Sequence, residues 1–185
     1  EDNPKEQESP FNLSHDASVI AAQMVLKAVT GAQLICNGGS FRPLKVVTRP
    51  GTIFNASPTA PMGFYYETRI RLYDFLWRTL AIKMPDRLPA GHFASICGTM
   101  IGGIHLETGR HYNIIEPQVG GWGGSANNDG NSAMFSACHG ETYNCPVEIS
   151  ERRYGVMVNQ LRLNCNKNGA GRYRGGKGIL VEYQI

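Results

Sequence analysis

The periodicity of the chain changes near residue 88, and this change constrains the fold more than any other feature. Before it, two stretches repeat apolar residues every three or four positions, as helices do. After it, short apolar runs alternate with glycine, asparagine and aspartate, as in strands joined by turns. We therefore expect an α+β fold, with two helices in the N-terminal half followed by a half rich in strands and glycine turns.

Two helices are predicted before residue 88. Residues 14–31 begin with Ser14 or Asp16 as a cap and end at Gly31, a natural stop. The second helix is predicted over residues 65–84, where one apolar stripe consists of Ile70, Tyr73, Trp77, Leu80 and Met84. Four charged residues lie off that stripe, namely Arg69, Arg71, Asp74 and Arg78.

Strands are predicted from β-branched and apolar runs. Residues 44–56 favour short strands interrupted at Pro50-Gly51. The second half contains five further candidate strands, at 92–106, 111–119, 132–140, 156–165 and 178–185. We treat the chain as one segment with three parts, a loop over 1–13, a helix and strand part over 14–88, and a strand-rich part over 89–185.

Composition excludes several classes of protein. Apolar residues make up 42% of the 185 residues and charged residues 18%, which favours a globular domain over a disordered chain. A net charge of +3 is too small to indicate nucleic-acid binding. No apolar run approaches the ~20 residues that a membrane span needs. The five cysteines form no C-x-x-C pair, which argues against structural zinc and favours a cytoplasmic location.

Residues 120–130, "GGWGGSANNDG", form a loop dense in glycine, which we call the glycine loop. Glycine lets backbone N–H groups approach a ligand closely, and Asn127, Asn128 and Asp129 could hydrogen-bond a polar substrate. A loop that needs glycine only for its backbone geometry is the alternative.

The segment "CHGETYNCP", residues 138–146, combines several residue types that bind metals or act in catalysis. Cys138, His139, Glu141 and Cys145 are of metal-ligand type, but their spacing matches no zinc site. A Cys138 nucleophile would need His92, His105 or His111 as its base, because adjacent strand residues face apart. Candidate general bases elsewhere are Asp129, Glu116 and Glu148.

Residues 169–178, "GAGRYRGGKG", resemble a phosphate loop only in part, and we call them the C-terminal glycine segment. Gly178 stands where Ser or Thr would hold magnesium, and a strand follows instead of a helix. We interpret the segment as a glycine-shaped turn whose Arg172 and Arg174 contact another part of the protein.

Four ordered motifs resemble the hydantoinase B/oxoprolinase family. They are "FRPLKVVTRPGTIFNA", "GGWGGSANNDGNSA", "NCPVEISERRYG" and "NGAGRYRGGKGILVEY". The resemblance extends from about Asn37 to Glu182. It implies that the chain is the C-terminal part of a larger B-type subunit. Cys145, Tyr154-Gly155 and the aromatic, basic stretch 64–77 depart from the family pattern and favour the acetone and acetophenone carboxylase branch.

The family resemblance also implies the chemistry. We expect part of a cytoplasmic, multi-subunit, ATP-dependent ketone carboxylase. Hydrolysis of a cyclic amide, as in hydantoinases, 5-oxoprolinases and caprolactamases, is the alternative, and a non-catalytic scaffold is another. ATP and Mg²⁺ are expected on a hydantoinase A-like partner subunit. A divalent metal is expected only in the upstream part of the B-type subunit, and no metal ligand is assigned here.

We predict that the glycine loop and "YNCPVE" lie side by side and border a substrate chamber or a subunit interface. Glu148 and Arg172 are the expected charged partners of the loop. The predicted chamber or interface residues are Gly121, Gly123, Asn127, Asn128, Asp129, Asn144, Arg172 and Arg174.

Overall fold

The computed structural model describes residues 3–31, 35–137, 139–140, 142–165 and 168–185. The chain forms two compact units, residues 1–95 and residues 96–185. Within the described residues, no helix is both long and apolar enough to cross a membrane.

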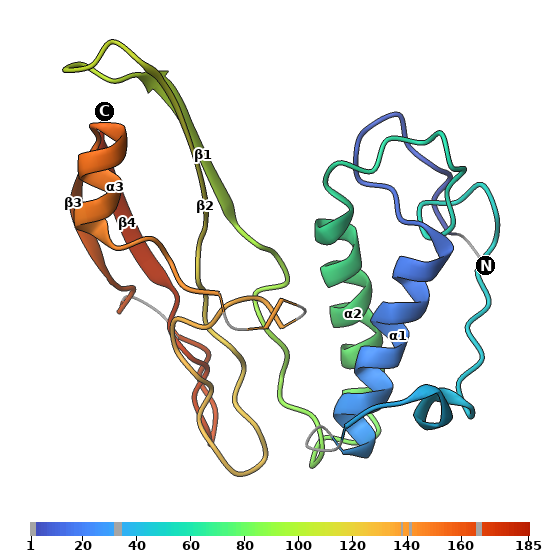
Figure 1. Ribbon diagram of the computed structural model, residues 1–185. Coiled ribbons are helices and arrows are strands. Elements are labelled where there is room, and N and C mark those ends of the chain that lie inside the picture. Colours follow the sequence, from blue (N-terminus) through green and yellow to red (C-terminus); the bar gives the residue numbers. More distant parts are fainter. Residues whose placement is uncertain (1–2, 32–34, 138, 141, 166–167) are drawn as a thin grey trace. The chain divides into compact units, whose positions relative to one another are not determined.

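The first unit is built on two helices that lie side by side, α1 (His15–Thr30) and α2 (Tyr65–Ala81) (Figure 1). Ser14 caps α1, since its Oγ accepts the N–H of Ala17 at 3.2 Å, and Gly31 ends the helix at φ 145°. A short 3₁₀ helix, η1 (Gly38–Phe41), lies between them in sequence. The core of the unit includes Leu13, Ala21, Val25, Ile70 and Tyr73.

Helix α2 ends at Ala81, shorter than predicted, and its buried face includes a charge. Asp74, which the periodicity places off the apolar stripe, is only 9% exposed. Its carboxylate lies 3.8 Å from the Arg78 guanidinium, and its Oδ1 would lie 3.1 Å from a Cβ on Gly91. Asp74 is therefore buried because the segment at Gly91 packs against that side of the helix.

Residues 44–56 do not form the predicted strands. They contain isolated bridges instead, Lys5 with Thr52 and Thr52 with Asn55. The Ile53 N–H donates to the Pro4 carbonyl at 3.0 Å, and the Leu13 N–H donates to the Ile53 carbonyl at 2.8 Å. The turn at Gly51 interrupts the run, so the N-terminal loop pairs with it only at single residues.

The second unit contains two antiparallel strand pairs. Strand β1 (Gly98–Ile104) pairs with β2 (His111–Pro117), with Ile101 opposite Ile114. Strand β3 (Met157–Leu163) pairs with β4 (Ile179–Gln184), with Leu161 opposite Val181. Four of the five strands predicted in this half are therefore confirmed, and so is the α+β class.

Two expectations for the second half were wrong. The described residues of 132–140 form no strand, because Ala133 has a φ of 52°, and among them only Met134 forms a bridge, with Gly120. A helix that the periodicity missed, α3 (Val147–Tyr154), follows "NCP". Its eight residues are too short for a clear apolar period. Its end signals are nevertheless present, with Glu148 in the first turn and the left-handed Gly155 at the end.

Candidate functional site

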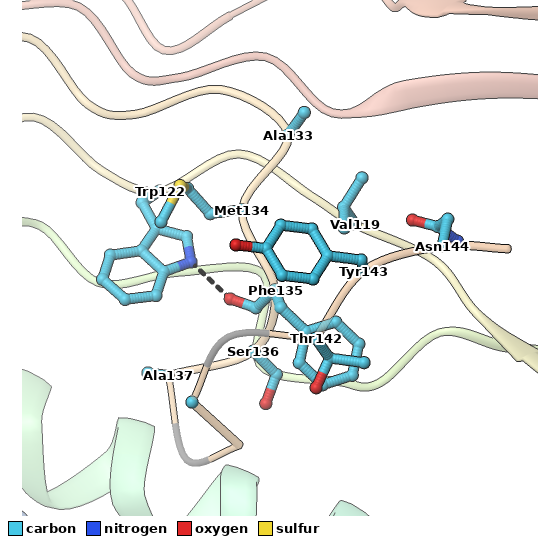
Figure 2. A pocket seen from close by; sticks show the side chains of 11 residues that line it. Val119, Trp122, Ala133, Met134, Phe135, Ser136, Ala137, Thr142, Tyr143 and Asn144 are labelled. Atoms are coloured by element: carbon cyan, nitrogen blue, oxygen red, sulfur yellow. Dashed lines mark hydrogen bonds between the residues drawn. The ribbon is translucent and has the colours of Figure 1, made fainter. Parts of the chain in front are cut away.

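A cavity of about 510 Å³ opens in the second unit, between three segments that flank the glycine loop. One wall is formed by Val119 and Trp122, a second by residues 133–137, and the third by residues 142–144. Most of these side chains are apolar or aromatic, and Figure 2 shows how they lie. A cavity of this size and lining is typical of small-molecule sites.

Hydrogen bonds hold the first two walls together. Gly120 and Met134 exchange both backbone hydrogen bonds, at 2.8 and 2.7 Å. The Trp122 indole N–H donates to the Phe135 carbonyl at 2.9 Å (Figure 2). The Trp122 ring is therefore fixed in orientation at the base of the glycine loop.

The third wall is attached to the end of β2 through Glu116. The Oε1 of Glu116 accepts the Asn144 amide and the Cys145 N–H, each at 2.8 Å. The Asn144 amide also donates to the Pro117 carbonyl at 2.7 Å. Two predicted site residues, Glu116 and Asn144, are thus brought together, and Glu116 positions the "YNCPVE" segment.

A serine and a histidine form a polar pair beside the apolar lining. Ser136 lines the cavity, is 1% exposed, and its Oγ lies 2.8 Å from Nδ1 of His139. The His139 ring also packs edge-on against Phe135, with centroids 5.8 Å apart. A hydroxyl that is hydrogen-bonded to an imidazole can exchange a proton with it, so this pair is the cavity's candidate acid–base group.

The glycine loop is bound to the C-terminal glycine segment through the backbone. The Gly130 N–H donates to the Arg174 carbonyl, and the Gly176 N–H donates to the Trp122 carbonyl, each at 2.7 Å. The Arg174 N–H in turn donates to Oδ1 of Asp129 at 2.7 Å. Two segments about 45 residues apart in sequence therefore form one layer without regular strands.

Glycine is required at this contact because the two backbones leave no room for a side chain. A Cβ on Gly121 would lie 2.0 Å from the Gly176 carbonyl oxygen. A Cβ on Gly176 would lie 2.0 Å from the Asn131 carbonyl oxygen. Real Cβ atoms do not approach backbone atoms so closely, so the high glycine content of both motifs follows from their mutual packing.

The remaining predicted site residues lie in several places. Asn127, Asn128 and Asp129 are exposed at the loop tip and are not among the residues that line the cavity. The carbonyl carbon of Gly123 would lie 2.8 Å from a Cβ on Gly130, inside the loop. Glu148 is exposed in the first turn of α3.

The arginines do not hold the loop as expected. The Arg172 guanidinium lies over the ring of its sequence neighbour Tyr173, 5.5 Å from the ring centroid. Arg174 holds the loop through its backbone, while its side chain is exposed. Asp129 therefore has a backbone partner in place of Glu148 or Arg172, because the two backbones approach too closely for long side chains to lie between them.

The C-terminal glycine segment does not fit a nucleotide phosphate. A phosphate loop aims free N–H groups at its ligand. Here the N–H groups of Arg174, Gly175, Gly176 and Lys177 donate to Asp129 Oδ1, the Gly169 carbonyl, the Trp122 carbonyl and Ser132 Oγ. These donors are used within the protein, so the segment is structural.

Among the described residues, no group of three His, Cys, Asp or Glu side chains could hold a metal ion. Cys138 and Glu141, which sequence analysis considered as ligands, lie outside the described residues. His139 instead has Ser136 and Phe135 as neighbours.

Three of the four ordered motifs lie in the second unit and meet in two packing arrangements. One is the contact between the glycine loop and the C-terminal glycine segment, which we call the glycine contact, and the other is the attachment of "YNCPVE" to β2. The hydantoinase B/oxoprolinase family matches residues 1–185. The chain belongs to this family. Three relatives align with 80% or more of this hydantoinase B-like chain. Each relative is much longer, so the chain covers less than a third of its length.

An uncharacterized protein of Methanocaldococcus jannaschii is 32% identical over 179 residues, which are 96% of this chain and 31% of that protein. A 5-oxoprolinase of Dictyostelium discoideum is 30% identical over 179 residues, 96% of this chain and 13% of that protein. The caprolactamase subunit beta of Pseudomonas jessenii is 28% identical over 155 residues, 80% of this chain and 26% of that protein.

Solved structures share the fold. The ATP-dependent caprolactamase of Pseudomonas jessenii matches with a TM-score of 0.86 at 21% identity, over 98% of this chain and 32% of that chain. Nucleotide-free acetone carboxylase matches with a TM-score of 0.76 at 17% identity, over 92% of this chain and 23% of that chain.

Several residues of the site were not predicted from the sequence. Trp122, Phe135, Ser136 and Tyr143 line the cavity, yet none was a candidate. A tryptophan within a run of glycines was the available signal, because a large ring in such a loop must pack against something. For the hydrogen bond between Ser136 and His139, the sequence offered no indication other than their separation of three residues.

Proposed function

We propose that this chain is part of an ATP-dependent cyclic-amide hydrolase, and that its apolar cavity receives the ring of the substrate. The observation that carries the proposal is the cavity itself, about 510 Å³ with an apolar lining and a few polar groups. A cyclic amide matches this composition, because it combines a hydrocarbon body with one amide group.

The relatives favour this reaction over the carboxylation that sequence analysis placed first. The 5-oxoprolinase and the caprolactamase subunit are 30% and 28% identical to this chain, whereas the acetone carboxylase likeness, at 17%, is one of fold alone. Carboxylation of a ketone is therefore the second candidate, supported by the fold and by the motif departures noted above.

The described residues would act by binding and by proton transfer. Trp122, Met134 and Phe135 would hold the ring and exclude water from it. The Ser136–His139 pair would exchange a proton with a polar atom of the substrate at the cavity wall. Asn144 uses its amide N–H groups on Glu116 and Pro117, so its role is to position this wall.

Cofactor and partners extend the proposal beyond this chain. ATP would activate the amide carbonyl oxygen. We propose ATP and Mg²⁺ on a hydantoinase A-like partner because four consecutive N–H groups of the C-terminal glycine segment, those of residues 174–177, donate within the protein. The name of the caprolactamase relative, a subunit beta, supports a multi-subunit assembly. A divalent metal upstream, a role for the exposed loop tip in the chamber and a cytoplasmic location remain predictions.

The test is turnover by the full-length protein purified with its partner subunits. We expect ATP-dependent ring opening of at least one cyclic amide among 5-oxoproline, hydantoin and caprolactam. Acetone with bicarbonate is the competing substrate, and its carboxylation without amide hydrolysis would establish the second candidate. An assembled complex that turns over none of these substrates would identify a scaffold role.

A cavity variant separates the role of this chain from that of its partners. Ala137→Leu adds bulk to the lining and should raise KM about tenfold while assembly is retained. Ala90→Leu, at an exposed position that is not in the lining, is the matched control and should leave KM unchanged. Equal KM values in both variants and the unmodified complex would contradict a substrate in this cavity.

A further inference from the structure

A second hollow, of about 390 Å³, lies between the end of the β1–β2 hairpin and the C-terminal end of α3. Its lining is strongly basic. The hairpin contributes His105, Arg110 and His111, and the helix contributes Arg152 and Arg153. No Asp or Glu is among the described residues that line it.

The two elements that supply these side chains are in direct contact, so the basic groups face one common space. The rings of Tyr112 on β2 and Tyr154 on α3 pack with centroids 6.2 Å apart. A Cβ on Gly155 would lie 3.2 Å from the His105 ring, and Gly155 has a φ of 67°. Glycine at this position thus permits both the end of α3 and its close approach to the hairpin.

Two of the basic groups are oriented by their neighbours. The Arg153 guanidinium lies over the Tyr154 ring, 5.5 Å from the centroid, which restricts its motion. Nδ1 of His105 accepts the Glu107 N–H at 3.2 Å, so the neutral ring carries its proton on Nε2 as a donor. The hollow therefore offers fixed donors as well as positive charge.

Ordinary helix electrostatics explains only part of this cluster. Arginines in the last turn of a helix are stabilised by its dipole, which accounts for Arg152 and Arg153. It does not account for Arg110 and two histidines brought to the same place by a separate hairpin. Glu151 is not among the lining residues, and its Oε1 accepts the Val158 N–H at 2.9 Å.

We propose that this hollow binds a phosphate-class oxyanion, such as phosphate or diphosphate. Three arginines that converge without a lining carboxylate repel one another, and a multiply charged anion would remove that repulsion and accept their hydrogen bonds. Arginine suits phosphate because its planar fork pairs with two oxygens. The proposal is independent of the reaction assigned to the apolar cavity.

The test is calorimetric titration of the full-length protein in its assembly with diphosphate at low ionic strength. Inorganic phosphate and ADP serve as parallel probes. We expect saturable diphosphate binding that weakens as salt is added, because screening reduces the attraction at an exposed site. ADP binding that is as tight as diphosphate binding and is weakened by Arg110→Ala would identify a nucleotide as the source of the phosphate. Diphosphate binding that Arg110→Ala weakens, with ADP binding unaffected, would identify the free anion.

Substitutions on each side of the hollow complete the experiment. Arg110→Ala and Arg153→Ala should each raise the Kd for diphosphate about tenfold, since each removes charge-assisted hydrogen bonds. Arg162, which is also exposed, lies on β3 outside the lining; Arg162→Ala is the matched control and should leave the Kd unchanged. If Arg153→Ala fails to fold, Arg153→Lys keeps the charge, loses the fork and should still weaken binding.

Three results would overturn the proposal. The first is the absence of saturable binding of either anion at low salt. The second is an equal loss of affinity in Arg110→Ala and Arg162→Ala, which would show only a general charge effect. The third is tight binding of a glutamate-rich peptide without binding of diphosphate, which would make the hollow a protein contact.

Discussion

The α1–α2 pair of the first unit and the glycine contact of the second unit are stabilised in opposite ways. The helices pack through side chains, with Ile70 fully buried and Tyr73 5% exposed. The glycine loop and the C-terminal glycine segment pack through backbone atoms, with hydrogen bonds of 2.7 Å and no room for a Cβ. The α1–α2 pair is therefore stabilised by the volume of its buried side chains, whereas the glycine contact requires that side chains be absent.

This difference shows why both glycine motifs are needed together. Neither segment forms a strand or helix of its own, so each depends on the other to satisfy its backbone polar groups. The C-terminal glycine segment, although it resembles a phosphate loop in part, therefore serves in packing against the glycine loop.

Gly176→Ala should have the largest effect. Its Cβ would lie 2.0 Å from the Asn131 carbonyl oxygen, and backbone cannot move aside as a flexible side chain can. We expect the second unit to lose about 4 kcal/mol or more of unfolding free energy. Urea denaturation followed by tryptophan fluorescence in a Trp77→Phe background, where Trp122 is the tryptophan of this chain that remains, measures this loss.

Gly98→Ala is the matched control in the same unit. No atom lies within 4 Å of its Cβ position, and Gly98 does not have a positive φ. It should change stability by less than about 1 kcal/mol. Equal losses in the two variants would show that the close approach at Gly176 is not what determines stability.

Ile70→Ala should destabilise the first unit by about 3 kcal/mol, since it leaves a cavity in a fully buried position between the helices. Ile82→Ala, at a residue that is 77% exposed, is the control and should cost little. Circular dichroism during denaturation reports the helical unit. A larger loss in Ile82→Ala than in Ile70→Ala would contradict side-chain packing as its main support.

Asp129→Ala should cost about 1 kcal/mol in the second unit, because it removes the acceptor of the Arg174 N–H at an exposed site. Asp129→Asn keeps an oxygen acceptor and should cost less. A fall of more than tenfold in activity of the assembled Asp129→Asn enzyme, with its melting temperature retained, would instead indicate a catalytic role for the loop tip.

The stability of the first unit should fall slightly as pH drops below about 6.5, the ordinary pKa of histidine. Burial lowers the pKa of His92, and Arg71 lowers it further, while Asp74 partly opposes the shift. The unfolded chain therefore binds the proton first on acidification, so stability is full above that pH and declines below it. His92→Asn should flatten the decline in thermal melts, and an unchanged slope would exclude His92 as its cause.

Lys177→Ala should have the smallest effect on both the stability and the nucleotide affinity of the assembled complex. The Lys177 ammonium lies 3.7 Å from Cys165 Sγ, and its backbone N–H donates to Ser132 Oγ, a bond that alanine would keep. Nucleotide affinity of the assembled complex should remain unchanged. A tenfold loss, about 1.4 kcal/mol, would show that the segment binds nucleotide after all.

Local patterns predicted the regular elements of the fold well. The cap at Ser14, the stop at Gly31 and the apolar stripe of α2 each have a short-range cause, so residue spacing was sufficient. The short α3 was missed because its period is brief, although its end signals were legible. The strands over 44–56 failed because β-branched composition does not supply a partner strand.

The site was less accessible to sequence reasoning, because its contacts join distant segments. The pairing of Asp129 with the Arg174 N–H and of Gly121 with Gly176 depends on tertiary packing between residues 45 and 55 positions apart in the sequence. Glu116 was a candidate base, yet the structure places its carboxylate on Asn144 and Cys145, as a positioning residue. The residue type of Glu116 indicated a polar role, but it did not indicate which neighbours its carboxylate would hydrogen-bond.

Amide hydrogen exchange of the full-length protein tests the backbone contact most directly. The N–H groups of Gly130, Arg174 and Gly176 lie in irregular segments, yet each donates a 2.7 Å hydrogen bond across the contact. We predict that these three amides exchange as slowly as those of the β3–β4 pair, since they open only with the whole unit. Exchange at the rate of an unstructured glycine loop would contradict the account.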